Sequence, residues 1–181
     1  MAGFVYLFRL GKVDPALLDL AERCIRDQFR LPTRIAARKI DLAPTFDSVR
    51  NQYHSTKLLR EVITDPPGDA LRLLGLTEVD LFIPIFTFLF GEAQLHGPGT
   101  ILSVHRLRHR FYGLPENRDQ FHERVRKEVM HELGHTFGLV HCFDPVCAMR
   151  SSTYVEEIDL KSEEFCDGCR LRLEEKLTPL R

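Results

Sequence analysis

Three histidines in one short segment have the spacing of a metal site. Residues 131–141 read HELGHTFGLVH and fit the pattern HExxHxxGxxH at each fixed position. Residues four apart on an α-helix lie one above the other, so His131 and His135 can bind one ion together. Gly138 can adopt the left-handed conformation that ends a helix, which lets the chain turn back and bring His141 to the same ion. Three neutral imidazoles with one open position are typical of a catalytic zinc site.

Glu132 is the expected general base of this site. It follows the first histidine by one residue, so its side chain projects about 100° away around the helix, beside the metal. A carboxylate there can take a proton from a zinc-bound water, whose pKa the metal lowers from about 15.7 to roughly 7. Any one of these histidines alone would be an ordinary helix or loop residue, but the extended pattern is far more restrictive than HExxH.

Four cysteines behind the histidines predict a second, structural zinc. Cys142 and Cys147 lie in CFDPVCAM, and Cys166 and Cys169 lie in EFCDGC. The CxxC spacing lets two thiolates bind one tetrahedral ion from a tight turn, and four cysteines would close its shell. The alternatives are two disulfides or a redox CxxC pair. A chain without a secretory signal is expected in a reducing compartment, which disfavours disulfides.

These segments together resemble the archaemetzincin (archaelysin) family, a branch of the metzincin zinc peptidases. The resemblance is sharpest over residues 127–170 and extends more loosely upstream through FDSVRNQY, FLFGEAQ and SVHRLR. It implies a metzincin-like fold and a peptide or protein substrate, with Glu132 as the general base. It also implies two zinc ions per chain, a catalytic one on His131, His135 and His141 and a structural one on Cys142, Cys147, Cys166 and Cys169.

By the same resemblance, Met149 lies in the Met-turn, a hydrophobic floor beneath the three imidazoles. The alternative, an ordinary core methionine, is partly the same role, because both are packing. The segment behind Met149 departs from the family pattern. Metzincins often carry a tyrosine there that helps to hold the transition state, whereas Arg150, Ser151 and Ser152 come next in this chain. We assign no such role to Tyr154.

Length and composition indicate one domain of the α/β (α+β) class. The chain has 181 residues, which suits a single metzincin-like domain with a mixed twisted sheet of about five strands and an antiparallel edge strand. We expect an N-terminal subdomain over residues 1–138 that ends in the active-site helix, and a small zinc-stabilised C-terminal subdomain over residues 139–181. Little in that second part can form a core, so we expect the cysteine-bound zinc to order it.

Charge and hydropathy exclude two classes of partner. The net charge is -1 with 28% charged residues, so no overall field favours nucleic acid or an anionic membrane. No apolar run is long enough to span a bilayer. The first residues read as a strand and not as a signal peptide, and little precedes them that could act as an inhibitory pro-segment. We expect a cytoplasmic monomer.

Hydrophobic periodicity and capping residues predict the other elements. Strands are expected at residues 4–10, 34–42, 80–83, 88–94 and 101–107. Helices are expected after Asp14 and Pro15, after Ser55 or Thr56, over residues 69–74 closed by Gly75, after Asn117 with a capping box to Gln120, and near the C-terminus around Leu171, Leu173 and Leu177. The inward face of the first helix is Leu17, Leu18, Ala21, Cys24, Ile25 and Phe29, which makes Cys24 a core residue and not a ligand.

The long helix after Asn117 must position the histidines. Phe121, Val125, Val129, Leu133 and Phe137 recur every four residues and form its inward stripe. His131 and His135 lie off that stripe, so another face can present the metal to a cleft. By the resemblance, FLFGEAQ forms the edge strand of the cleft's upper rim, where an extended peptide can pair; the alternative is a covered, purely structural strand.

Two further sets of residues, and the function itself, leave alternatives open. In FDSVRNQYHS, Arg50, Gln52 and Tyr53 either belong to a solvated loop or approach the cleft. His105 and His109 are tempting extra ligands, but isolated histidines are usually packed or solvated. The leading function is a zinc-dependent peptidase. The alternative is a zinc-stabilised peptide-binding or regulatory module with little or no proteolytic activity.

Overall fold

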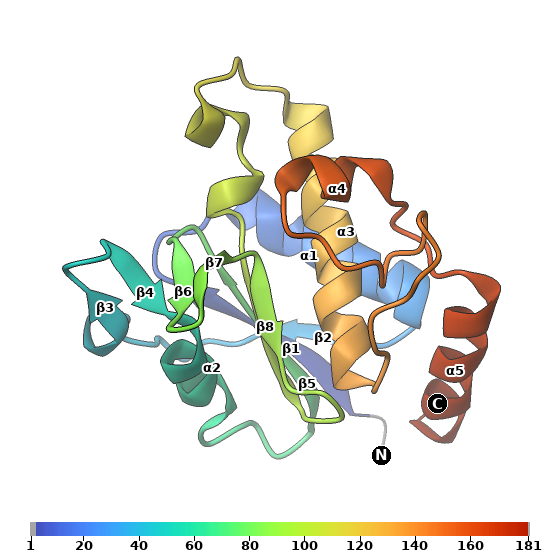
Figure 1. The fold of residues 1–181 in the computed structure, drawn as a ribbon. Helices are drawn as coiled ribbons and strands as arrows, with labels where there is room; N and C mark the ends of the chain where they lie inside the picture. Colours follow the sequence, from blue (N-terminus) through green and yellow to red (C-terminus); the bar gives the residue numbers. More distant parts are fainter. Residues whose placement is uncertain (1–2, 181) are drawn as a thin grey trace.

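A five-stranded mixed sheet forms the centre of the computed structural model, which describes residues 3–180 (Figure 1). The strand order is β2-β1-β5-β9-β8. Its members are β1 (Phe4–Leu10), β2 (Thr33–Ile35), β5 (Ala70–Thr77), β8 (Gly91–Ala93) and β9 (Gly99–Ser103). The first four in that order are parallel, and β8 pairs antiparallel with β9 at the edge, with Glu92 opposite Ile101. The predicted mixed sheet with an antiparallel edge strand is therefore confirmed.

A second sheet of four short strands continues the rim of the first. Its order is β3-β4-β6-β7, with β3 (Phe46–Asp47), β4 (Gln52–His54), β6 (Leu81–Ile83) and β7 (Phe86–Leu89). Both β7 and β8 are edge strands, and only Phe90 separates them in the chain. The predicted strand at residues 88–94 is thus divided between two sheets. One continuous segment carries the free edge of both.

Helices cover the two faces of the central sheet. The alternation of β1 places Val5 and Leu7 in the same core as α1 (Pro15–Phe29) and α3 (Arg118–Thr136), whereas Tyr6 and Phe8 share a core with α2 (Ser55–Ile63). Two shorter helices follow, α4 (Val155–Leu160) and α5 (Asp167–Leu177). Single 3₁₀ turns are η1 (Ala43–Thr45), η2 (His105–Leu107), η3 (His109–Tyr112) and η4 (Thr178–Leu180). Figure 1 shows α3 running between the edge strand β8 and the C-terminal segment with α4 and α5.

The capping predictions for the two long helices are confirmed. The carboxylate of Asp14 accepts a hydrogen bond from the backbone N–H of Ala16, and the side-chain oxygen of Asn117 accepts one from the N–H of Gln120. The capping box is only half formed, because Oε1 of Gln120, the atom that would accept from the N–H of Asn117, contacts Nε2 of His109 at 2.8 Å instead. The predicted inward stripe of α3 is buried throughout. This stripe fixes the rotation of α3 and turns His131 and His135 away from the sheet.

The predicted helix over residues 69–74 is wrong. This segment belongs to β5, which lies between β1 and β9 in the middle of the sheet. Leu73 and Leu74 are both fully buried, one in each core. A strand covered on both faces reads as an unbroken apolar run and lacks the alternation that identifies a half-buried strand. Gly75 ends no helix: a Cβ there would lie 2.6 Å from Cδ1 of Leu10.

Three smaller boundaries also differ from expectation. The strand expected at residues 34–42 is only β2, and the strand expected to reach residue 107 ends at Ser103, before η2. Helix α2 begins at Ser55, so His54 and neither Ser55 nor Thr56 is the N-cap residue. No helix in the described part of the chain has the length and apolarity that crossing a bilayer requires.

Candidate metal centres

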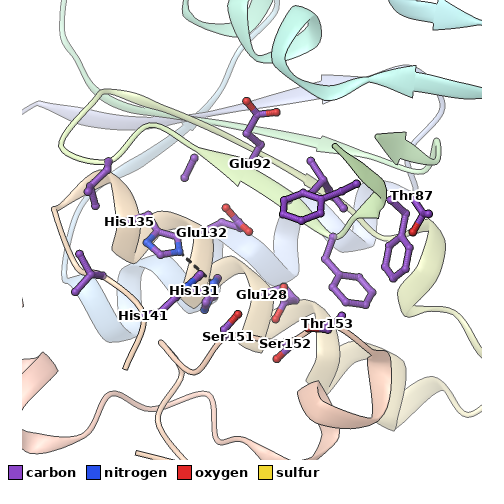
Figure 2. A pocket seen from close by; sticks show the side chains of 18 residues that line it. Thr87, Glu92, Glu128, His131, Glu132, His135, His141, Ser151, Ser152 and Thr153 are labelled. Carbon is purple, nitrogen blue, oxygen red and sulfur yellow. Dashed lines mark hydrogen bonds between the residues drawn. The ribbon is translucent and has the colours of Figure 1, made fainter. Parts of the chain in front are cut away.

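Three imidazoles meet where α3 ends. His131 and His135 stand one turn apart on the helix, and the chain returns His141 to them after Gly138, whose φ of +88° suits glycine. One ring nitrogen of each histidine lies within 4.8 Å of the others. Figure 2 shows the three rings gathered at one end of the cleft. This donor set can hold one metal ion.

Backbone carbonyls orient two of the three rings. Nδ1 of His131 donates to the carbonyl oxygen of Ala148 at 2.9 Å, and Nδ1 of His135 donates to that of Leu139 at 2.7 Å. Such partners fix the tautomer and leave Nε2 as the metal-binding atom. The two Nε2 atoms lie 3.1 Å apart, as two ligands about 2.0–2.1 Å from one zinc ion can. The residues present therefore fit zinc.

Burial keeps these imidazoles in the form that binds metal. It lowers the pKa of His131 well below the ordinary 6.5, and the positive charge of Lys161 adds to the effect. Burial likewise lowers the pKa of His135 and, with Lys161, that of His141. A lowered pKa means a neutral ring at neutral pH, with a free lone pair for the ion.

Glu132 lies between the metal ligands and the edge strand. Its side chain is 6% exposed, and a Cβ built on Gly91 of β8 would lie 2.5 Å from its Cδ. Thr100 of β9 donates to Oε2 of Glu132 at 3.4 Å. Burial, followed by the nearby Glu128 carboxylate, raises the pKa of Glu132 well above its ordinary value. A carboxyl with a raised pKa can both accept and return a proton near neutral pH.

A cleft of about 560 Å³ runs past the three histidines. Its upper rim is the continuous segment of β7 and β8, its floor is α3, and its lower wall is Ser151, Ser152 and Thr153 (Figure 2). The predicted rim segment therefore faces the cleft, and β8 is a sheet edge as expected. Tyr154 is 64% exposed and is not among the residues that line the cleft.

A buried ion pair in this cleft was not predicted from the sequence. Glu128 lines it and is 3% exposed, and its Oε1 lies 2.8 Å from Nζ of Lys161, whose side chain is fully buried. Lys161 also donates to the carbonyl oxygen of Arg150 at 3.2 Å. Glu128 could have been found, because it precedes His131 by three residues and so shares its helix face. Nothing in the spacing indicates its partner, which is 33 positions later.

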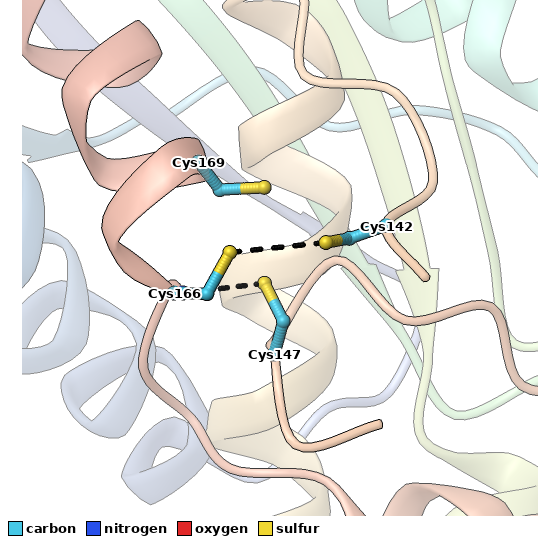
Figure 3. Close-up of side chains that lie close together, drawn as sticks. All are labelled: Cys142, Cys147, Cys166 and Cys169. Carbon is cyan, nitrogen blue, oxygen red and sulfur yellow. Dashed lines mark hydrogen bonds between the residues drawn. The ribbon is translucent and has the colours of Figure 1, made fainter. Parts of the chain in front are cut away.

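The four cysteines lie together on the far side of α3 from the sheet edge. Cys142, Cys147, Cys166 and Cys169 place their Sγ atoms within 4.8 Å of one another (Figure 3). Sγ of Cys142 and Sγ of Cys166 are 3.8 Å apart, which equals the edge of a tetrahedron with Zn–S bonds of about 2.3 Å. This separation far exceeds a disulfide bond of about 2.05 Å, and the five cysteines of the described chain are free. The donor set fits zinc.

Hydrogen bonds and burial further distinguish the cysteines. The backbone N–H groups of Met149 and Cys166 point to Sγ of Cys147 at 3.4 and 3.3 Å, as donors do around metal-bound thiolates. Cys24 lies apart in the core of α1, as predicted, and burial raises its pKa to about 12. It is an inert core residue.

The remaining candidates support the cleft without lining it. His105 and His109 contact the Glu78 carbonyl and the Gln120 amide, so neither joins the metal cluster. Arg50 donates to the carbonyl oxygen of Phe86 at 3.0 Å, and Gln52 to that of Thr87 at 2.9 Å. The segment that holds them is a hairpin of β3 and β4 and not a solvated loop, and it braces β7 from behind.

Comparison with known proteins agrees with this geometry. The model of Peptidase family M54 matches residues 22–175. The chain is 38% identical to the archaemetzincin of Methanocaldococcus jannaschii over 168 residues, covering 92% of this chain and 90% of that one. The crystal structure of archaemetzincin from Methanopyrus kandleri superimposes with a TM-score of 0.85 at 32% identity, over 98% and 96% of the two chains. That from Archaeoglobus fulgidus, complexed with malonate, gives 0.80 at 31%, over 93% and 99%.

The fold and the histidine cluster thus define a metallopeptidase of the metzincin class. Within that class, the chain belongs to peptidase family M54, the archaemetzincins.

Proposed function

We propose that the protein hydrolyses peptide bonds with a catalytic zinc held by His131, His135 and His141 and with Glu132 as general base. One observation supports this above all others. The bare Nε2 atoms of two oriented imidazoles and the third histidine converge beside a buried carboxyl, inside a cleft with a free sheet edge. A ligand set of three neutral histidines leaves a coordination position open for chemistry.

The substrate peptide pairs with the edge strand β8. Its backbone N–H and C=O groups bond to the unpaired groups of that strand, which adds a strand to the sheet. We take the added strand to run antiparallel to β8. The residues that follow the scissile bond then lie toward β7, and those that precede it lie toward His135.

The chain's own groups supply the proton transfers. A zinc ion held by His131, His135 and His141 would supply a Lewis acid for the attacking water and the scissile carbonyl. Glu132 takes the proton of the attacking water and delivers it to the leaving amine. Its raised pKa makes the carboxylate a stronger base toward the water proton, and the carboxyl group that forms is still acidic enough to protonate a leaving amine.

The cysteine-bound zinc would be structural. Its four thiolates leave no position open, and they would staple residues 139–181 into the C-terminal subdomain. Two observations support a role for Met149 as the hydrophobic floor beneath the three imidazoles. Its side chain is fully buried, and a Cβ built on Gly134 of α3 would lie 2.7 Å from its Sδ. The methionine therefore packs against the helix backbone between the two histidines of α3.

Replacement of the base tests the proposal. Zinc-loaded wild type and Glu132→Ala are incubated with a peptide library, and products are measured by mass spectrometry. We expect the variant to lose cleavage by about 10²–10⁴-fold while retaining zinc at wild-type stoichiometry by elemental analysis. Glu123→Ala, on an exposed position of the same helix, is the matched control and should cleave normally.

Two outcomes would contradict the proposal. Undiminished cleavage by Glu132→Ala would remove the general base. A wild type that carries both metals and binds peptides without cleaving any would favour the peptide-binding module instead.

A further inference from the structure

Glu128 is a buried carboxylate in the cleft that the proposed chemistry leaves unused. It lies outside the histidine cluster and one turn before His131 on α3. Among residues 3–180, its ion-pair partner is Lys161, at 2.8 Å. Figure 2 shows it on the side of His131 toward Thr87, opposite His135. A charged acceptor is thus held at one end of the cleft, beside the scissile position.

The walls around Glu128 are aromatic above and hydroxylic below. Phe86 and Phe88 line the cleft from β7, and Phe86 is 54% exposed. Phe88 is fixed from two sides, by an edge-to-face contact with Phe90 at 5.3 Å and by the guanidinium of Arg106 at 4.2 Å. On the lower wall, Oγ of Ser152 is buried and has no hydrogen-bond partner within the described part of the chain. A flat side chain with a polar tip suits this end of the cleft.

We propose that Glu128 is a specificity-determining residue, whose carboxylate accepts a hydrogen bond from the hydroxyl of a substrate tyrosine that lies against Phe86 and Phe88. This rests on the proposed peptidase function. With the substrate antiparallel to β8, the tyrosine directly follows the scissile bond. Ser152 can supply a second polar contact to the same hydroxyl.

Charge explains why a neutral donor is selected. The Glu128 and Lys161 pair is already neutral, so a substrate lysine or arginine would bring a second cation against the buried ammonium of Lys161. A phenylalanine has the right shape but would cover the carboxylate without replacing the water it displaces, and that costs binding. A tyrosine satisfies both the apolar wall and the acceptor.

Substrate variation on the wild-type protein is the first test. A series of peptides differs only in the residue after the scissile bond, which is tyrosine, phenylalanine, leucine or lysine. We expect kcat/KM for tyrosine to exceed that for phenylalanine about tenfold, the ratio that a hydrogen bond to a charged group supplies, and lysine to be poorer than either. Equal values for tyrosine and phenylalanine, or a preference for lysine, would overturn the inference.

Removal of the acceptor is the second test. Glu128→Leu alone would leave Lys161 buried and unpaired, so the variant is Glu128→Leu/Lys161→Met, which replaces both charges with apolar groups. We expect the ratio of kcat/KM for the tyrosine peptide to kcat/KM for the phenylalanine peptide to fall to about one in this variant, whatever its overall rate. Glu123→Leu is the matched control and should keep the preference. A double variant that retains the tenfold preference would overturn the inference, and one that fails to fold leaves the decision to the peptide series.

Binding separates this inference from the proposed function. In the Glu132→Ala background, the affinities of fluorescent tyrosine and phenylalanine peptides are compared with and without the Glu128→Leu/Lys161→Met change. A tenfold difference that disappears with the change supports the role of Glu128 even if no peptide is cleaved. Cleavage that depends on Glu132 but shows no difference in binding rejects the inference alone.

Discussion

The carboxyl of Glu132 and the backbone of the edge strand are in direct contact. Gly91 of the rim strand β8 lies against the side chain of Glu132 on α3, with no room between them for a methyl group. The absence of a side chain at this position therefore lets the rim approach the proposed base. The same closeness excludes water from one side of the carboxyl, which helps to raise its pKa.

Substitution of Gly91 by alanine should damage both stability and catalysis. The new methyl group would lie 2.5 Å from Cδ of Glu132, and relief of such a clash typically costs about 1–3 kcal/mol of unfolding free energy. Urea denaturation measures that loss, and kcat should fall because the base is displaced. Gly68→Ala is the control, since nothing lies within 4 Å of its added Cβ. Indistinguishable behaviour of the two variants would show that the rim yields without moving Glu132.

The positions of individual site residues could be predicted from the sequence where they depend on residues close by in the chain. The convergence of His131, His135 and His141 follows from helix geometry and one glycine turn, and the structure bears it out. The contact of His96 with Gly138 could not be foreseen. It joins the turn after β8 to the end of α3, and no spacing rule connects two loops about 40 positions apart.

The attachment of α4 to α3 positions the lower wall of the cleft, because residues 151–153 lead directly into α4. Arg124 forms two hydrogen bonds of 2.7 Å with the carboxylate of Asp159, and Lys127 donates to the Asp159 carbonyl oxygen. Val155 and Ile158 add apolar burial beneath. The expectation that little in this stretch can form a core is therefore wrong, and the ordering role of the cysteine-bound zinc stays a prediction. Polar contacts with α3 and the burial of Val155 and Ile158 in the core that α1 and α3 share both hold it.

Loss of Asp159 should loosen this attachment. Asp159→Ala leaves the guanidinium of Arg124 buried without its partner, and breaking such a pair costs about 3 kcal/mol or more. The measurement is chemical denaturation of the zinc-loaded protein. Glu156→Ala, an exposed change on the same helix, should cost less than about 1 kcal/mol. An equal effect of the two changes would mean that α4 is held by other contacts.

Elements buried on both faces were the least predictable. The segment LRLLGLT of β5 shows no period of two, because both faces of a central parallel strand are apolar. The break at Phe90, where the chain passes from β7 in one sheet to β8 in the other, could not be predicted either. Residues 88–94 were predicted as one strand, and which sheet each part joins depends on partners far away in the chain.

For the molecule as a whole, the two metal centres share one stretch of backbone. His141 and Cys142 are consecutive, and Ala148, whose carbonyl orients His131, follows Cys147 directly. The N–H of Cys142 also donates to the carbonyl oxygen of Met149 at 2.9 Å. We therefore expect a change in the cysteine centre to shift the third histidine and the carbonyl that orients the first.

Disruption of the cysteine centre should weaken zinc binding at the histidines. We expect Cys169→Ser to lose the cysteine-bound zinc and to bind the other zinc about 10–100-fold more weakly, as the loss of supporting contacts typically does. Elemental analysis after dialysis against graded chelator measures both. Cys24→Ala, in the core of α1, should keep two zinc ions per chain. A serine variant that retains one zinc with wild-type affinity would show that the centres are independent.

The burial of the ion pair between Glu128 and Lys161 has one more consequence. Mobile ions screen exposed charges strongly but reach a desolvated pair poorly. The ion pair of Glu128 with Lys161 connects the lower wall of the cleft to α3. We expect this connection to persist from low to high salt concentration, whereas the attraction between Arg34 and Asp69 on the surface weakens as salt is added.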